Sequence, residues 1–102
     1  MGLEISKILT ISTAHIKQET GELLHNNNEA NCKLPVYYKK DEYGCFVFCN
    51  KDYMKDAIQD QSYEEIPQDL WRCMVLARIF DCDYLCLDCD GTIVDGLQTY
   101  EW

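Results

Sequence analysis

The feature that most constrains the fold is a pair of strand-like segments joined by a short polar loop. Residues 34–39 (LPVYYK) and 45–49 (CFVFC) are rich in β-branched and aromatic side chains, and the loop between them (KDEYG) ends in glycine. This pattern predicts a β-hairpin. Because the strands of a hairpin are antiparallel, it counts against an all-parallel sheet. Both faces of the second strand are apolar, so we expect this strand in the centre of its sheet.

Four further elements are expected around the hairpin. Short β-rich runs predict strands at residues 5–11 and 84–89. A helix is expected over residues 14–25, with Ser12 or Thr13 capping its start. The clearest helical periodicity begins at Pro67, which suits a first helical turn, and ends near Asp81.

A shorter helix is expected between the hairpin and the Pro67 helix. Asn50 would cap it, and it would continue through Ile58, whose side chain is spaced to pack inward. Residues 60–65 are expected to be a polar linker.

The resulting order, β-α-β-β-α-β with the extra short helix, predicts an α+β fold. We expect a mainly antiparallel sheet with two helices on one face, as in ferredoxin-like folds, and with the first and last strands ending at opposite edges. A small open α/β sheet is the alternative. The length of 102 residues predicts a single domain over residues 1–102.

The charge balance favours a protein partner over nucleic acid. Eighteen acidic residues face nine basic ones, for a net charge of -9, whereas binding to nucleic-acid phosphates requires an excess of lysine and arginine. We therefore expect no direct nucleic-acid binding. The partner that this negative charge would attract is a basic protein.

Compartment and membrane predictions follow from the cysteines and the apolar runs. The cysteine count of seven is odd, and the start MGLEISKIL lacks the pattern of a signal peptide, so we expect reduced thiols in the cytoplasm. No apolar stretch approaches the ~18–20 residues that span a bilayer, so we expect no membrane association.

Residues 88–95 (DCDGTIVD) resemble the first motif of haloacid-dehalogenase-type phosphatases, in which two aspartates flank one residue before Gly-Thr. The resemblance would make Asp88 the nucleophile and Asp90 the general acid, with magnesium alongside. Only residues 93–102 follow, without room for the lysine and further metal ligands that phosphoryl transfer needs. We therefore expect the match to be coincidental, with no catalytic residue, metal or cofactor, and with an edge strand running into an Asp-Gly turn.

The spacing of Cys82, Cys86 and Cys89 matches the iron–sulfur motif of radical SAM enzymes. In a strand, however, Cys82 and Cys86 would lie about 13 Å apart, and Cys86 and Cys89 would face opposite sides. This geometry predicts no metal cluster.

His15 follows Ser12 and Thr13 at a strand-to-helix junction, where it could act as a base or ligand. A capping or packing role is the expectation. A dyad with one of the cysteines stays open.

Residues 11–16 (ISTAHI), 83–91 (DYLCLDCDG) and 99–102 (TYEW) together resemble an uncharacterised family of small proteins encoded on bacterial phages, plasmids and conjugative elements. The resemblance implies a mobile-element origin and carries no established activity. Small acidic proteins of such elements often act on host machinery, including restriction or CRISPR systems. It therefore implies an inhibitor of a host nucleic-acid-binding or defence protein.

These observations predict a small, acidic, non-enzymatic binding protein whose acid-rich segments at 52–65 and 81–95 form the candidate surface. One alternative is a metal-dependent phosphatase-like enzyme that uses Asp88 and Asp90. Another is a homo-oligomeric structural module that pairs through a strand edge or its aromatic tail. The candidate surface or site residues are Ser12, Thr13, His15, Asp88, Asp90, Tyr100 and Trp102.

Overall fold

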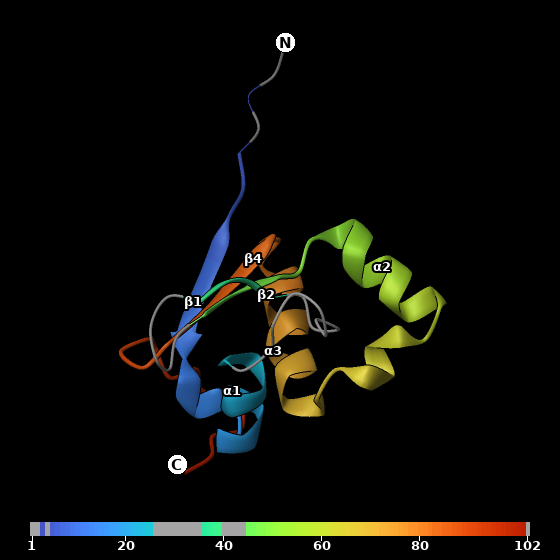
Figure 1. Cartoon of the computed structure of the whole chain (residues 1–102). Coiled ribbons are helices and arrows are strands. Elements are labelled where there is room, and N and C mark those ends of the chain that lie inside the picture. Colours follow the sequence, from blue (N-terminus) through green and yellow to red (C-terminus); the bar gives the residue numbers. More distant parts are fainter. Residues whose placement is uncertain (1–2, 4, 26–35, 40–44, 102) are drawn as a thin grey trace.

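In the computed structural model, which describes residue 3 and residues 5–25, 36–39 and 45–101, four strands form one mixed sheet (Figure 1). The sheet has the order β1-β4-β3-β2. Strands β2 and β3 are antiparallel, as are β3 and β4, whereas β1 and β4 are parallel. The strands are β1 (Ile8–Ser12), β2 (Val36–Lys39), β3 (Cys45–Phe48) and β4 (Tyr84–Asp88).

The hairpin prediction is confirmed, since β2 and β3 pair antiparallel with Lys39 opposite Cys45. Its loop lies outside the described residues. Strand β3 is flanked by β2 and β4, as its two apolar faces predict.

The α+β class is confirmed, but the predicted ferredoxin-like arrangement is wrong about β1 and β4. They are neighbours in parallel register, with Ser12 opposite Asp88, and β4 is an interior strand. The cause is the composition of β4. Leu85 and Leu87 on one face and Cys86 on the other are all buried, and such a strand buries most surface between two neighbours.

Three α-helices and two short 3₁₀ turns connect the strands in the described part of the chain. They are η1 (Thr13–His15), α1 (Gln18–His25), α2 (Lys51–Gln59), η3 (Ser62–Glu65) and α3 (Gln68–Ile79). The helix expected over residues 14–25 therefore begins four residues late. The Ser12 hydroxyl accepts the Ala14 N–H at 3.0 Å, which caps η1, and the chain turns extended at Ile16 before α1 starts.

The short helix α2 forms as predicted. The Asn50 side chain accepts the Tyr53 N–H at 2.8 Å, so it caps the helix. Ile58, expected to pack inward, is instead exposed, while Met54 and Ala57 are buried. The expected linker at 60–65 contains η3.

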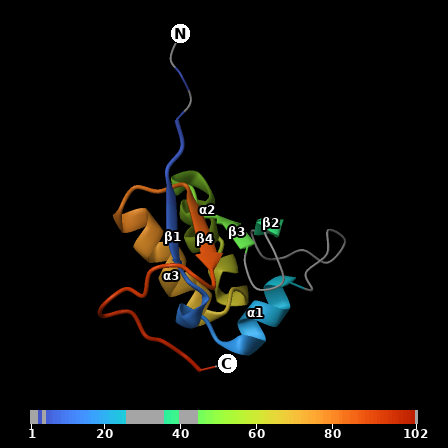
Figure 2. The same ribbon diagram turned by 90° about the vertical axis from the view of Figure 1, so that its left-hand side faces the viewer.

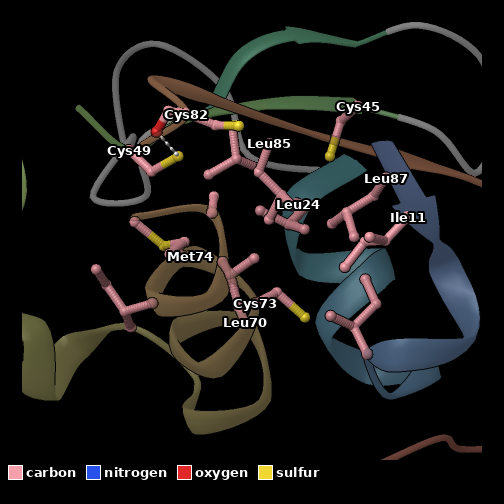
Figure 3. Close-up of a cluster of buried hydrophobic side chains, with 14 of the residues drawn as sticks. Ile11, Leu24, Cys45, Cys49, Leu70, Cys73, Met74, Cys82, Leu85 and Leu87 are labelled. Atoms are coloured by element: carbon pink, nitrogen blue, oxygen red, sulfur yellow. Dashed lines mark hydrogen bonds between the residues drawn. The ribbon is translucent and has the colours of Figure 1, made fainter. Parts of the chain in front are cut away.

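Helices α1 and α3 pack on the same face of the sheet. Leu24 of α1 and Leu70 and Met74 of α3 meet the inward side chains of the strands in one cluster (Figure 3). The strand side chains in this cluster are Ile11, Cys45, Val47, Leu85 and Leu87.

The described residues before β1 and the C-terminal segment, residues 92–101, lie at opposite ends of β1. Residues 5–7 extend beyond the sheet, whereas the C-terminal segment crosses the carboxyl ends of β1 and β4 (Figure 2). Val94 and Leu97 of the C-terminal segment pack against the core. In the part of the chain described, none of the helices has the length and apolar character that crossing a bilayer requires.

Candidate functional site

The sequence motifs at the two ends of the chain meet at the carboxyl ends of β1 and β4. Parallel pairing puts Ser12 opposite Asp88, and the Ser12 N–H donates to the Thr92 carbonyl at 2.9 Å. A parallel bridge between Ile11 and Thr92 extends the sheet by one residue on this side. The predicted site residues on β1 and β4 are therefore adjacent, although they were expected at opposite edges.

Gly91 permits this close approach. A Cβ atom at this position would collide with the backbone carbonyl of Ile11. Because that obstacle is backbone, it cannot rotate away as a side chain would. Gly91 is thus required by packing between the motif after β4 and the end of β1.

His15 joins the C-terminal segment to η1. The ring is only 1% exposed, Nε2 accepts the Val94 N–H at 2.9 Å, and Nδ1 lies 3.0 Å from the Gln98 carbonyl oxygen. Because a backbone N–H only donates and a carbonyl only accepts, the ring is neutral with its proton on Nδ1. Both ring nitrogens are therefore engaged with backbone groups, and neither is free to act as a general base.

The contacts of the described residues do not favour a Cys–His dyad, because both ring nitrogens of His15 are engaged with backbone groups. Cys73 Sγ donates to the backbone carbonyl of His15 at 3.8 Å, not to its ring. Burial raises the pKa of the Cys73 thiol to about 12, and burial likewise raises that of Cys49 to about 12. Thiols held in the neutral form are poor nucleophiles and poor metal ligands.

The candidate residues Thr13 and Tyr100 make backbone hydrogen bonds within the fold. Thr13 is buried, and its carbonyl accepts the Ile16 N–H. The Tyr100 N–H donates to the Ala14 carbonyl at 2.7 Å. Trp102 lies outside the described residues.

The turn after β4 gathers Asp88, Cys89 and Asp90. Their ligand atoms lie within 4.8 Å of one another, the one such group of three among the described residues. The Asp90 N–H donates to Asp88 Oδ1 at 2.9 Å, which fixes the Asx turn. The two carboxylates suit magnesium, whereas the thiol of Cys89 does not. Cys82 and Cys86 are buried while Cys89 is exposed, so these three thiols do not form a cluster.

The acidic residues of α2 and η3 form an exposed surface, here termed the acidic surface. Asp52 and Asp56 share one face of α2, which also carries the exposed Lys51 and Lys55, so the excess of acids comes from the end of α2 and from η3. Hydrogen bonds from Ser62, through its side chain and its N–H, hold the pKa of Asp60 below its ordinary value. Among the described residues, no ion pair neutralises these acids. The acidic surface consists of Asp52, Asp56, Asp60, Glu64 and Glu65.

A groove of about 490 Å³ opens beside the η3 end of the acidic surface. The rings of Tyr63 and Trp71 lie 5.4 Å apart between centroids, with their planes at 33°. Sequence reasoning missed this groove because the spacing of Trp71 along α3 is that of a side chain on the apolar face, and Trp71 does pack against the core as well as lining the groove. The groove is lined by Tyr63, Glu64, Glu65, Ile66, Pro67, Gln68 and Trp71.

A second cleft, of about 530 Å³, lies between α1, α3 and the C-terminal segment. Lys17 Nζ lies 5.8 Å from the centre of the Tyr100 ring, and Arg72 Nη1 donates to Gln98 Oε1 at 3.4 Å. At its base, buried Asp69 accepts the Lys17 N–H at 2.7 Å and the Thr20 hydroxyl at 3.1 Å. Both carboxylate oxygens of Asp69 are thus engaged in holding α1 on α3.

Comparison with known proteins gives a match to one family model over almost the whole described fold. The model, described as a family of unknown function (DUF5983) C-terminal domain, matches residues 8–102. No curated protein and no solved structure matches the chain.

Proposed function

We propose that this chain, which belongs to the DUF5983 family of unknown function, is a non-enzymatic binding protein whose partner is a basic protein. The observation that carries the proposal is the acidic surface of α2 and η3, which is exposed and has no neutralising ion pair among the described residues. Over residues 51–65, five acidic side chains stand against two lysines, Lys51 and Lys55, which offset part of the repulsion among the acids. Cations from a partner would remove the remaining repulsion, so charge complementarity favours their binding.

The burial and hydrogen bonds of the candidate residues on η1 and at the end of β1 support a role without catalysis. His15 uses both ring nitrogens to hold the C-terminal segment, and Ser12 and Thr13 are buried in the turn that begins η1. These side chains stabilise the fold and present no acid or base to a substrate.

The partner class follows from charge. A protein that binds nucleic acid carries a basic surface, which a net charge of -9 attracts over distances up to roughly a Debye length. We therefore propose a host nucleic-acid-binding or defence protein as the partner, inhibition as the outcome and, as part of the same proposal, a mobile-element origin.

Capture from a host lysate with matched charge variants tests this function. The tagged wild type should retain a basic protein that Asp52→Asn/Asp56→Asn loses. The control Glu19→Gln/Glu22→Gln, which removes the same two charges from α1, should still retain it. Equal capture by both variants would contradict a role for the acidic surface.

A second candidate is metal-dependent, phosphatase-like chemistry, favoured by the proximity of the Asp88, Cys89 and Asp90 ligand atoms. It predicts magnesium-dependent hydrolysis of p-nitrophenyl phosphate that Asp88→Asn abolishes. Equal rates for the wild type and the variant would remove this candidate.

A further inference from the structure

The groove beside η3 combines aromatic walls with an acidic rim. Tyr63 and Trp71 are half-buried, and their rings lie 5.4 Å apart. Glu64 and Glu65, next to Tyr63 in the chain, are exposed and line the same groove, as does the buried Ile66. A ligand in this groove therefore meets aromatic surface and carboxylates together.

These two features select a particular cation. An arginine guanidinium is planar and weakly hydrated, so it stacks on aromatic rings and pairs with a carboxylate through two hydrogen bonds. An ammonium group lacks the planar fork, and an anionic ligand would be repelled by Glu64 and Glu65. The volume of about 490 Å³ falls in the range of pockets that enclose small ligand groups.

The backbone before η3 holds the groove in position. Gln61 has φ 62° and ψ 15°, a left-handed conformation that costs a non-glycine residue roughly 1–2 kcal/mol. The Ser62 N–H then donates to Asp60 Oδ1 at 2.9 Å, which fixes the start of η3. The backbone that carries the acidic and aromatic residues of η3 is thus held in place before a ligand arrives, which lowers the entropic cost of binding.

We propose that this groove is an arginine subsite, which receives one arginine side chain from an extended basic segment of the partner protein. The inference rests on the proposed function and names the group that is recognised. The rest of the basic segment then lies along the acidic surface, where contacts are between exposed charges and are weaker.

Two synthetic peptides test the subsite. One is an unstructured chain of glycine and serine with several arginines, and the other carries lysine at the same positions. Calorimetry at low ionic strength gives their affinities, and the indole N–H resonances report contact with a tryptophan. We expect the arginine peptide to bind about fivefold to tenfold more tightly than the lysine peptide.

Variants of the rim and wall locate the binding. Glu64→Gln/Glu65→Gln should weaken the arginine peptide about tenfold, whereas Glu19→Gln/Glu22→Gln, with the same change in net charge, should weaken it less than about threefold. Tyr63→Leu, which keeps an apolar side chain, should reduce the preference for arginine over lysine. Circular dichroism confirms that each variant is folded.

The outcomes separate the subsite from the wider function. Equal affinity for both peptides, or equal weakening by the two charge variants, would contradict the arginine subsite while leaving a basic partner supported. Failure of the wild type to bind either peptide at low ionic strength would contradict the basic partner as well.

Discussion

At the residue scale, His15 is the side chain that ties the two ends of the fold together. Replacing it with alanine leaves the Val94 N–H and the Gln98 carbonyl without their partner and opens a cavity. We expect His15→Ala to lower the free energy of unfolding by about 2–4 kcal/mol, measured by urea denaturation. Gln98→Ala keeps the backbone carbonyl and should cost less than about 1 kcal/mol. Equal losses for the two variants would contradict this role of His15.

The buried thiols of Cys49 and Cys73 predict a loss of stability in alkali. Their pKa values are raised by burial from 9.0 to about 12, so between these values the unfolded chain releases protons that the folded chain keeps. Their contribution is therefore complete below about pH 9 and is lost as the pH rises toward 12, by up to about 1.4 kcal/mol per pH unit for each thiol. Urea midpoints between pH 8 and 11 measure this loss, and Cys73→Ala should make the decline with pH shallower. A slope unchanged in that variant would contradict the prediction.

At the scale of the elements, Asp69 shows how one helix caps another. It belongs to the first turn of α3, but its carboxylate accepts hydrogen bonds from the Lys17 N–H and the Thr20 hydroxyl at the start of α1. Asp69→Ala should lower the free energy of unfolding by roughly 2–3 kcal/mol, because one buried and one partly buried donor lose their acceptor. Hydrogen exchange should show the first turn of α1 opening more readily than α3. Uniform protection of α1 in the variant would exclude this capping role.

The elements also show which parts of the fold a sequence can predict. The hairpin and the Asn50 cap depend on residues a few positions apart, and both form as predicted. The pairing of β1 with β4 joins residues from opposite ends of the chain, and no local pattern encodes it. The signal that was available, apolar side chains on both faces of β4, identifies an interior strand without naming its neighbours.

In the candidate site, too, the features set by neighbouring residues could be predicted, and those set by distant residues could not. The acids at 52–65 were identified from composition, whereas the groove requires Tyr63 of η3 and Trp71 of α3 to meet, which depends on the turn at Gln61. His15 was noticed as a residue type, but its neutral state depends on contacts with residues 94 and 98.

At the scale of the whole molecule, the net charge opposes self-association. Leu3, Ile5 and Ile8 are exposed along the N-terminal segment and the β1 edge, where a second copy could pair. With a charge of -9 on each copy, we expect a monomer at micromolar concentration and low salt, measured by light scattering. A dimer that Ile5→Lys/Ile8→Lys abolishes would instead support the homo-oligomeric alternative.

The central position of β4 has a consequence for biosynthesis. Of the strands that the structure describes, β4 is the last to leave the ribosome, yet it lies between β1 and β3. Until it emerges, β1 has no neighbour and the nascent chain exposes strand edges that chaperones recognise. Ribosome-bound chains stalled before residue 84 should therefore remain sensitive to protease, and chains released with β4 complete should become resistant. Formation of the native sheet therefore waits for the synthesis of β4.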